Sequence, residues 1–153
     1  MNPSNYRPIS VLPVVMKIFE RAVQQQFVGY LTKHSVLCKE QSGFRKKHST
    51  QTATTDVTDY ILNNMDNGFL TGAVYLDLKK AFDSVDSETL LFKLKCLGVK
   101  SSEHTWFRNY IMDRSQWVQH SSVHSEKLPI SCGVPQGSIL GPMLNREISV
   151  VLN

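Results

Sequence analysis

The sequence lacks the features that mark membrane and secreted proteins. Its longest apolar run, Val11–Met16, is interrupted by Pro13 and is far shorter than the ~18 residues that a spanning helix needs. The N-terminus has no basic stretch followed by an apolar stretch, so it does not look like a signal peptide. We therefore expect an intracellular protein without a membrane partner, and nothing in the sequence distinguishes nucleus from cytoplasm.

Cysteine is also scarce. The three cysteines, Cys38, Cys96 and Cys132, each lie more than thirty residues from the next. No pair has the spacing of a zinc site or a redox motif, and an odd number argues against a disulfide framework. His120 and His124 lie four residues apart, but their segment has the pattern of a strand and does not suggest a metal site.

What the sequence does contain is the composition of a folded domain. It has 153 residues, of which 41% are hydrophobic and 20% charged, enough for about one domain with its own core. The formal net charge is +4. This mild excess is compatible with a polyanionic partner such as nucleic acid but does not establish one.

The apolar periodicity predicts four helices. The first covers Val14–Lys33, and the second starts at Ser49 or Thr50 and ends at Asn67–Gly68, where glycine stops it. The third is capped by Asp86 or Ser87 and closed by Gly98, and the fourth starts at Ser101 or Ser102. The expected apolar faces of the first two helices include these residues: Val15, Ile18, Phe19, Ala22, Phe27, Tyr30 and Leu31, then Ala53, Val57, Tyr60 and Ile61.

Three further segments have the pattern of strands. Gly72–Leu78 is apolar except for one carboxylate, which predicts a buried strand. Residues 116–123 and 127–131 predict two more strands around a polar turn, and Gly133–Ser138 is a glycine-rich turn that leads toward a helix. Helices combined with few strands favour an α+β fold.

Three segments contain residues that could carry chemistry. Asp77 lies in the apolar segment, where a carboxylate needs a metal, a cation or backbone N–H groups; it could equally be a capping or turn residue. The turn Gly133–Ser138 allows a ligand to approach the backbone but could be an ordinary loop. The basic loop Gly43–His48 could bind phosphates or simply be solvated. Asp83 and Asp86 are expected at a turn and a helix cap.

Taken together and in this order, the motifs identify a family resemblance. The chain resembles the reverse transcriptase domain of non-LTR (LINE-type) retrotransposons over about residues 3–144. The matching stretches are Asn5–Ser10, Gln41–Arg45 with Ser49 and Thr50, Ala73–Asp86, and Gly133–Pro142. Four ordered motifs at family-like spacing are far more specific than any one of them.

The resemblance implies a right-hand polymerase fold, with residues 1–70 as fingers, residues 71–153 as an incomplete palm, and no thumb. It implies an RNA-directed DNA polymerase that uses an RNA template, a DNA primer and deoxynucleoside triphosphates. Asp77 would be the catalytic carboxylate that binds Mg²⁺, with the main-chain carbonyl of Leu78 as a further metal ligand. A nucleotide pocket of this kind requires Asp77 to lie near the Pro-Gln turn and Arg45.

The same resemblance assigns the other site residues. Six positions would contact the incoming nucleotide: the fingers residue Arg45, the backbone amides of Lys80 and Ala81, the aromatic Phe82 beneath the sugar, and Gln136 and Gly137. Arg7 in the N-terminal motif would touch the nucleic acid.

The chain departs from the family pattern at its end. It stops before the family's Ala-Asp-Asp hairpin, and Glu147 is the only acidic residue after Gln136. The second Mg²⁺ site would be incomplete, so we expect the chain alone to be inactive. Without that hairpin, the strand at 72–78 would keep an open edge that a partner chain could cover. The alternatives are a non-catalytic nucleic-acid-binding remnant and an unfolded product of a decayed element.

Overall fold

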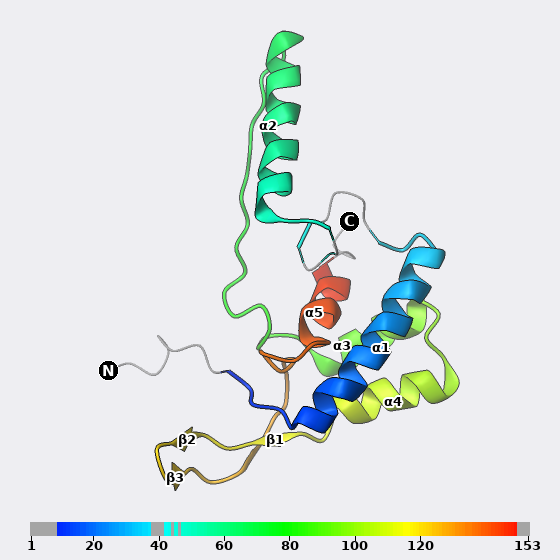
Figure 1. Ribbon diagram of the computed structural model, residues 1–153, viewed down its shortest axis with the longest axis vertical. Coiled ribbons are helices and arrows are strands. Elements are labelled where there is room, and N and C mark those ends of the chain that lie inside the picture. Colours follow the sequence, from blue (N-terminus) through cyan, green and yellow to red (C-terminus); the bar gives the residue numbers. More distant parts are fainter. Residues whose placement is uncertain (1–8, 38–41, 44, 46, 150–153) are drawn as a thin grey trace.

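The computed structural model describes residues 9–37, 42–43, 45 and 47–149. For residues 146–149 the description covers the backbone alone. The fold consists of helices and short antiparallel strands, which is compatible with the α+β class (Figure 1). In chain order the elements are α1 (Val14–Lys33), α2 (Thr50–Asp66), α3 (Ser87–Cys96), α4 (Ser101–Ile111), β1 (Ser115–Gln116), β2 (Gln119–His120), β3 (Val123–His124), β4 (Leu128–Pro129) and α5 (Gly141–Ser149).

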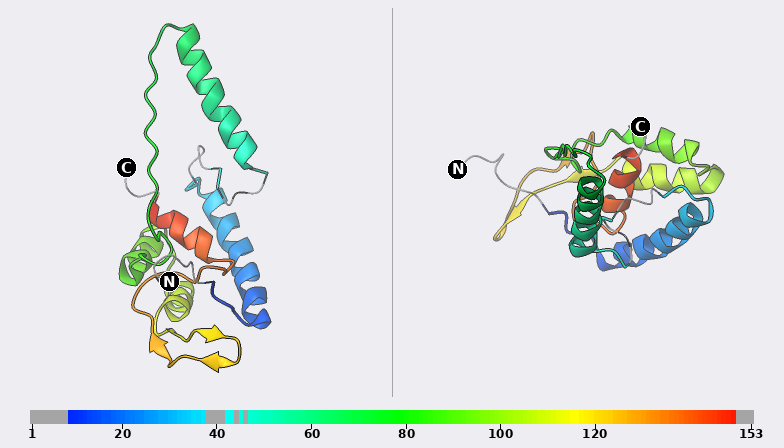
Figure 2. Two further views of the ribbon diagram at one scale, coloured as in Figure 1. Left: turned by 90° about the vertical axis from the view of Figure 1, so that its left-hand side faces the viewer. Right: turned by 90° about the horizontal axis from the view of Figure 1, so that it is seen from above.

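The four helices α1, α3, α4 and α5 pack together, and we call them the helical body (Figure 2). Helix α3 contacts both α4 and α5. The leucine side chains that are fully buried in its core are Leu31, Leu90, Leu94, Leu140 and Leu144. Burial of a leucine side chain stabilises a fold by about 1.5–3 kcal/mol, so this cluster is the main source of stability in the described structure.

Helix α1 has the predicted bounds but a different buried face. Phe27 and Leu31 are buried as expected, whereas Ile18 and Phe19 are exposed. The buried position in that part of the helix is Glu20, which lies seven residues before Phe27 and therefore on the same side. The predicted apolar face was wrong for the first half of α1, because a hydrogen-bonded carboxylate takes the inward position there.

Helix α2 has the predicted cap but not the predicted packing. The Ser49 hydroxyl accepts from the Thr52 backbone N–H, and the Thr52 hydroxyl accepts in turn from the Ser49 N–H, which together form a capping box. The helix extends away from the helical body, and none of its residues is buried (Figure 1). The predicted face is therefore not part of the core: Val57 and Tyr60 are 48% and 64% exposed.

The segment after α2 contradicts the sequence prediction most clearly. Residues 69–78 run back toward the helical body in an extended path that forms no strand (Figure 2). Their large apolar side chains are exposed: Phe69, Leu70, Val74, Tyr75, Leu76 and Leu78. A strand needs a neighbour for its N–H and C=O groups, and the described residues place none beside it. We call α2 and residues 69–78 the projecting arm.

The strands that do form are shorter than predicted. β1 pairs with β4 and β2 pairs with β3, both antiparallel. The stretch predicted as one strand at 116–123 contains a chain reversal, because Ser121 adopts a positive φ of 55° and the chain turns back at that point. Residues 115–129 thus form one hairpin, which we call the β-hairpin.

The remaining boundaries agree with the sequence predictions. Asp86 caps α3, and its carboxylate accepts from the Thr89 N–H at 2.7 Å. Gly98 follows α3 with φ 90°, a conformation that suits glycine, and α4 begins at Ser101. In the part of the chain that the structure describes, no helix has the length and apolar character to span a bilayer.

Candidate nucleotide site

Two of the sequence motifs meet at the turn that follows residue 80. The N–H of Gly133 donates to the carbonyl of Val85 at 2.7 Å, and the N–H of Val134 donates to the carbonyl of Phe82 at 2.8 Å. Within the turn, the Asp83 N–H donates to the Lys80 carbonyl at 2.9 Å, which confirms the turn predicted for Asp83. The glycine-rich loop therefore lies against the turn that carries Lys80, Ala81 and Phe82.

Gly133 permits this contact because it has no side chain. It adopts φ 89°, and a Cβ there would lie 2.9 Å from the Cα of Asp83 and 3.0 Å from the Phe82 carbonyl oxygen. Both neighbours are backbone atoms, which cannot move aside as the end of a flexible side chain can. Any other residue would push the loop away from the turn.

A third motif joins the same loop. The N–H of Ser10, the last residue of the N-terminal motif, donates to the carbonyl of Gln136 at 2.7 Å. A Cβ on Gly137 would lie 3.1 Å from the Ser10 carbonyl oxygen, so this contact also depends on a glycine. The loop that carries Gln136 and Gly137 is thereby fixed between the N-terminal segment and the turn at residue 80.

A buried carboxylate supports the loop from behind. Glu20 of α1 is fully buried; one of its oxygens accepts from the Tyr110 hydroxyl, and the other accepts from the Ile139 N–H at 3.0 Å. Burial and the hydrogen bond to Glu20 raise the pKa of Tyr110 above its usual range. The three groups come from α1, α4 and the segment that enters α5, so the carboxylate connects the loop to two helices.

Arg114 supports the loop from the side of α4. Its guanidinium donates to the carbonyl of Ile111 at 2.7 Å and to the carbonyl of Gly133. Burial lowers the pKa of this guanidinium from its ordinary value. Sequence analysis missed Glu20, Tyr110 and Arg114. For Glu20, the available signal was its spacing of seven and eleven residues from Phe27 and Leu31, which places a charged residue on a core face.

The predicted metal ligands Asp77 and Leu78 are exposed. Asp77 and Leu78 are on the exposed projecting arm, so the expectation of a carboxylate in a buried strand was wrong. Among the residues that the structure describes, no three His, Cys, Asp or Glu side chains lie together as metal ligands. One carboxylate and one carbonyl supply two of the six oxygens that Mg²⁺ prefers, so an ion held here would need waters, phosphate oxygens or further side chains for the rest.

The remaining predicted residues are distributed as follows. Phe82 and Ala81 are half-buried in the turn, Lys80 is exposed with φ 56°, and Gln136 is half-buried in the loop. Arg45 is half-buried, and its carbonyl accepts from the His48 N–H at 3.2 Å. Arg7 lies outside the described residues. The structure thus brings Phe82, Gln136 and Gly137 into one region but does not place Asp77 or Leu78 in a pocket with them.

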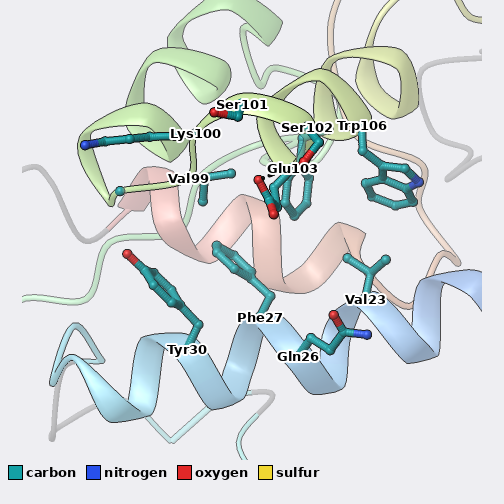
Figure 3. Close-up of a pocket in the computed structure, with 12 residues that line it drawn as sticks. Val23, Gln26, Phe27, Tyr30, Val99, Lys100, Ser101, Ser102, Glu103 and Trp106 are labelled. Atoms are coloured by element: carbon teal, nitrogen blue, oxygen red, sulfur yellow. Dashed lines mark hydrogen bonds between the residues drawn. The ribbon is translucent and has the colours of Figure 1, made fainter.

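A separate cavity lies between α1 and the start of α4 (Figure 3). It has a volume of about 620 Å³, and Phe27 and Tyr30 from α1 face Val99 and Trp106 across it. None of the residues predicted for the nucleotide site lines this cavity. It is therefore distinct from the candidate site.

Comparison with protein families gives a match over nearly the whole chain. Residues 2–149 match the family described as reverse transcriptase (RNA-dependent DNA polymerase). This range contains all four motifs and every predicted site residue.

Two individual relatives illustrate the similarity. The chain is 34% identical over 143 residues to the "Probable RNA-directed DNA polymerase from transposon BS" of Drosophila melanogaster. It is 34% identical over 140 residues to the "RNA-directed DNA polymerase from mobile element jockey" of the same species. The matches cover 94% and 92% of this chain but only 16% and 15% of the relatives, so the chain spans about a sixth of their length. No solved structure matches the chain.

Proposed function

The chain belongs to the reverse transcriptase family, and we propose that it supplies the nucleotide-facing part of such a domain without completing the catalytic centre by itself. The observation that carries this proposal is the meeting of three motifs at one loop: Ser10 bonds to Gln136, and Phe82 bonds to Val134. These contacts are between main-chain atoms, so they hold the loop in place whatever its side chains bind.

In the proposed site, Phe82 lies beneath the sugar of a deoxynucleoside triphosphate. The amides of Lys80 and Ala81, together with Arg45, face its phosphates, and Gln136 and Gly137 contact the nucleotide and its template. Backbone N–H groups and a guanidinium are well suited to triphosphate oxygens. Arg7 would touch the RNA template or the DNA primer.

The proposed metal role belongs to Asp77 and to the carbonyl of Leu78. A single carboxylate leaves most of the charge of two divalent ions uncompensated, so the residues of this chain need further oxygen ligands to hold Mg²⁺. Another strand that pairs with the exposed segment at 72–78 could supply these ligands, and it could come from a further segment or from a partner chain. In this proposal residues 1–70 are the fingers part and residues 71–153 belong to the palm.

The proposal predicts no DNA synthesis by a polypeptide of these 153 residues. The test is primer extension on an RNA template with Mg²⁺, using wild type, Asp77→Ala and the matched control Asp59→Ala in the exposed part of α2. We expect no extension by any of the three. Extension by wild type and Asp59→Ala that is abolished in Asp77→Ala would refute the proposal, because the chain would then form a working centre around Asp77.

A second candidate function is the binding of RNA without chemistry. The net charge of +4 and the basic loop with Arg45 and Lys47 favour it. Contacts to phosphates release counterions, so RNA affinity should fall steeply as salt rises, by a slope of about 0.7 per phosphate contacted on a logarithmic scale. An affinity that does not change with salt would exclude phosphate contacts. A cooperative thermal melt, followed by circular dichroism, would separately exclude the unfolded product of a decayed element.

A further inference from the structure

We propose that the β-hairpin at residues 115–129 binds single-stranded RNA, with Trp117 as a stacking surface for a base and Lys127 as the cation for a neighbouring phosphate. The choice of RNA rests on the proposed function. The surface itself is separate from the nucleotide-facing loop, and none of the predicted site residues belongs to it.

The β-hairpin has two faces of different chemistry. Side chains alternate along a strand, and residues directly opposite each other share a face. Gln119 pairs with His124, so Trp117, Gln119 and His124 lie on one face. His120 pairs with Val123, so Val118, His120 and Val123 lie on the other. One face is aromatic and polar, whereas the other is largely apolar.

The β1–β4 register itself brings the lysine to the aromatic face, because the position that follows the pair Gln116–Leu128 sets Trp117 opposite Lys127. Between the pairs Gln116–Leu128 and Gln119–His124, the first strand has two residues, 117–118, and the returning strand has three, 125–127. Val118 is hydrogen-bonded to Ser125, so the extra residue is Glu126, and an extra residue of this kind bends the returning strand. The Nζ atom of Lys127 lies 5.9 Å from the centroid of the Trp117 ring, and the His124 ring lies 6.5 Å from it.

Trp117 does not belong to the hydrophobic core of the described residues. Trp117 is 53% exposed, and the β-hairpin extends away from the helical body (Figure 1). Its strands are exposed on both faces, so the ring adds little to the core. An exposed ring beside a cation is the arrangement with which proteins hold single-stranded nucleic acid: the base stacks on the ring, and the cation neutralises phosphate. Glu126 is the acidic residue within the β-hairpin and partly offsets this charge.

The base of the β-hairpin is hydrogen-bonded to the loop of the candidate site. Arg114, which precedes β1, donates to the carbonyl of Gly133 in the glycine-rich loop. The Ile130 N–H, just after β4, donates to the carbonyl of Arg114 at 2.8 Å. Because its guanidinium donates to the carbonyls of Ile111 and Gly133, Arg114 anchors the β-hairpin and is not an expected RNA contact. RNA held on Trp117 would continue toward the loop that carries Gln136.

The test measures binding of a short, fluorescently labelled oligouridylate by anisotropy. Trp117→Ala should weaken binding roughly 5- to 150-fold, the loss expected for about 1–3 kcal/mol of stacking. Trp117→Phe, which keeps a ring, should recover most of the affinity. The matched control is Val118→Ala, the next residue along the strand but on the opposite face, and it should change the affinity by less than about twofold.

A second variant tests the cation. Lys127→Gln should reduce the slope of log affinity against log salt by about 0.7, the value for one contact with a single strand. Melting temperatures close to wild type will show that the variants still fold, since the β-hairpin lies outside the core. A salt slope that Lys127→Gln leaves unchanged would remove the lysine from the proposal.

The outcomes separate this inference from the proposed function. Binding by wild type that Trp117→Ala leaves unchanged would overturn the role of the β-hairpin alone. Absence of any binding by wild type would overturn both this inference and the RNA contacts of the proposed function. If Val118→Ala weakens binding as much as Trp117→Ala, the apolar face makes the contact, and the stacking account is wrong.

Discussion

The helical body and the projecting arm both contain segments that the sequence predicts to be buried, but only those of the helical body are. Leu94 in α3 and Leu76 in the arm both lie in apolar segments, yet Leu94 is fully buried and Leu76 is 88% exposed. The difference lies in where each segment finds its partners. α3 meets α4 and α5 within the chain, whereas residues 69–78 meet no neighbouring strand among the described residues.

Within the projecting arm, the predicted helix forms but the predicted strand does not, and the availability of hydrogen-bond partners explains this difference too. α2 is well formed although none of its side chains is buried, because a helix closes its hydrogen bonds between residues four apart and its capping box is local. An extended segment must find its hydrogen bonds in another strand. Local elements therefore form without tertiary packing, and the predicted strand at 72–78 does not.

The largest expected effect tests this comparison directly. Leu94→Ala removes a fully buried side chain between packed helices and should lower the free energy of unfolding by about 3–5 kcal/mol. Leu76→Ala makes the same chemical change at an exposed position and should alter it by no more than about 0.5 kcal/mol. Urea unfolding followed by circular dichroism measures both. Equal losses would show that the projecting arm is packed in solution and that the comparison is wrong.

The next effect concerns the buried carboxylate that holds the glycine-rich loop. Glu20→Ala leaves the Tyr110 hydroxyl and the Ile139 N–H without their acceptor, and it should reduce stability by about 2–3 kcal/mol. Glu126→Ala, at an exposed position in the β-hairpin, is the control and should change stability by less than about 0.5 kcal/mol. A Glu20→Ala variant as stable as this control would show that Glu20 does not fix the loop.

A smaller effect should appear at high pH. Burial and the hydrogen bond to Glu20 raise the pKa of Tyr110, so the folded protein keeps this proton to higher pH than the unfolded chain does. Below the ordinary tyrosine pKa of about 10 the raised pKa contributes in full to the free energy of unfolding. Above that pH the contribution is lost, by at most about 1.4 kcal/mol per pH unit. Unfolding free energies at several pH values above 10 should fall less steeply in Tyr110→Phe. An identical slope in the variant would contradict a buried Tyr110 hydroxyl.

The features that the sequence predicts correctly are those that depend on residues close together in the chain. The bounds of α1, the caps Ser49 and Asp86, and the stop at Gly98 rest on interactions within one turn of helix, and all agree with the structure. The strand at 72–78 and the buried face of α2 required partners far along the chain. Periodicity shows that a side chain can be buried but does not show what covers it.

The residues of the candidate site show the same contrast between local motifs and contacts made far along the chain. The motifs indicated Phe82, Gln136 and Gly137, and the structure places them in one region because glycines let the backbones approach. Glu20, Tyr110 and Arg114 belong to no motif, and their contacts reach across as many as 119 residues of sequence. The exposed position of Asp77 could not be predicted either, since it depends on whether a neighbouring strand is present.

The smallest expected effect concerns the one part of the projecting arm that forms by local signals. Ser49→Ala removes half of the capping box of α2, a change of about 1 kcal/mol in helix stability. Because α2 buries nothing against the helical body, we expect fraying of its first turn and no change in the global unfolding free energy. Hydrogen exchange of the amides of Ala53 and Thr54 should become about fivefold faster. Thr54→Ala, which removes a hydroxyl inside the same helix, should leave that exchange unchanged or slower, because alanine favours helices. If Ser49→Ala instead lowers the global stability by the full amount, α2 must be coupled to the core, and its exposed face would be covered in solution by contacts beyond those of the described residues.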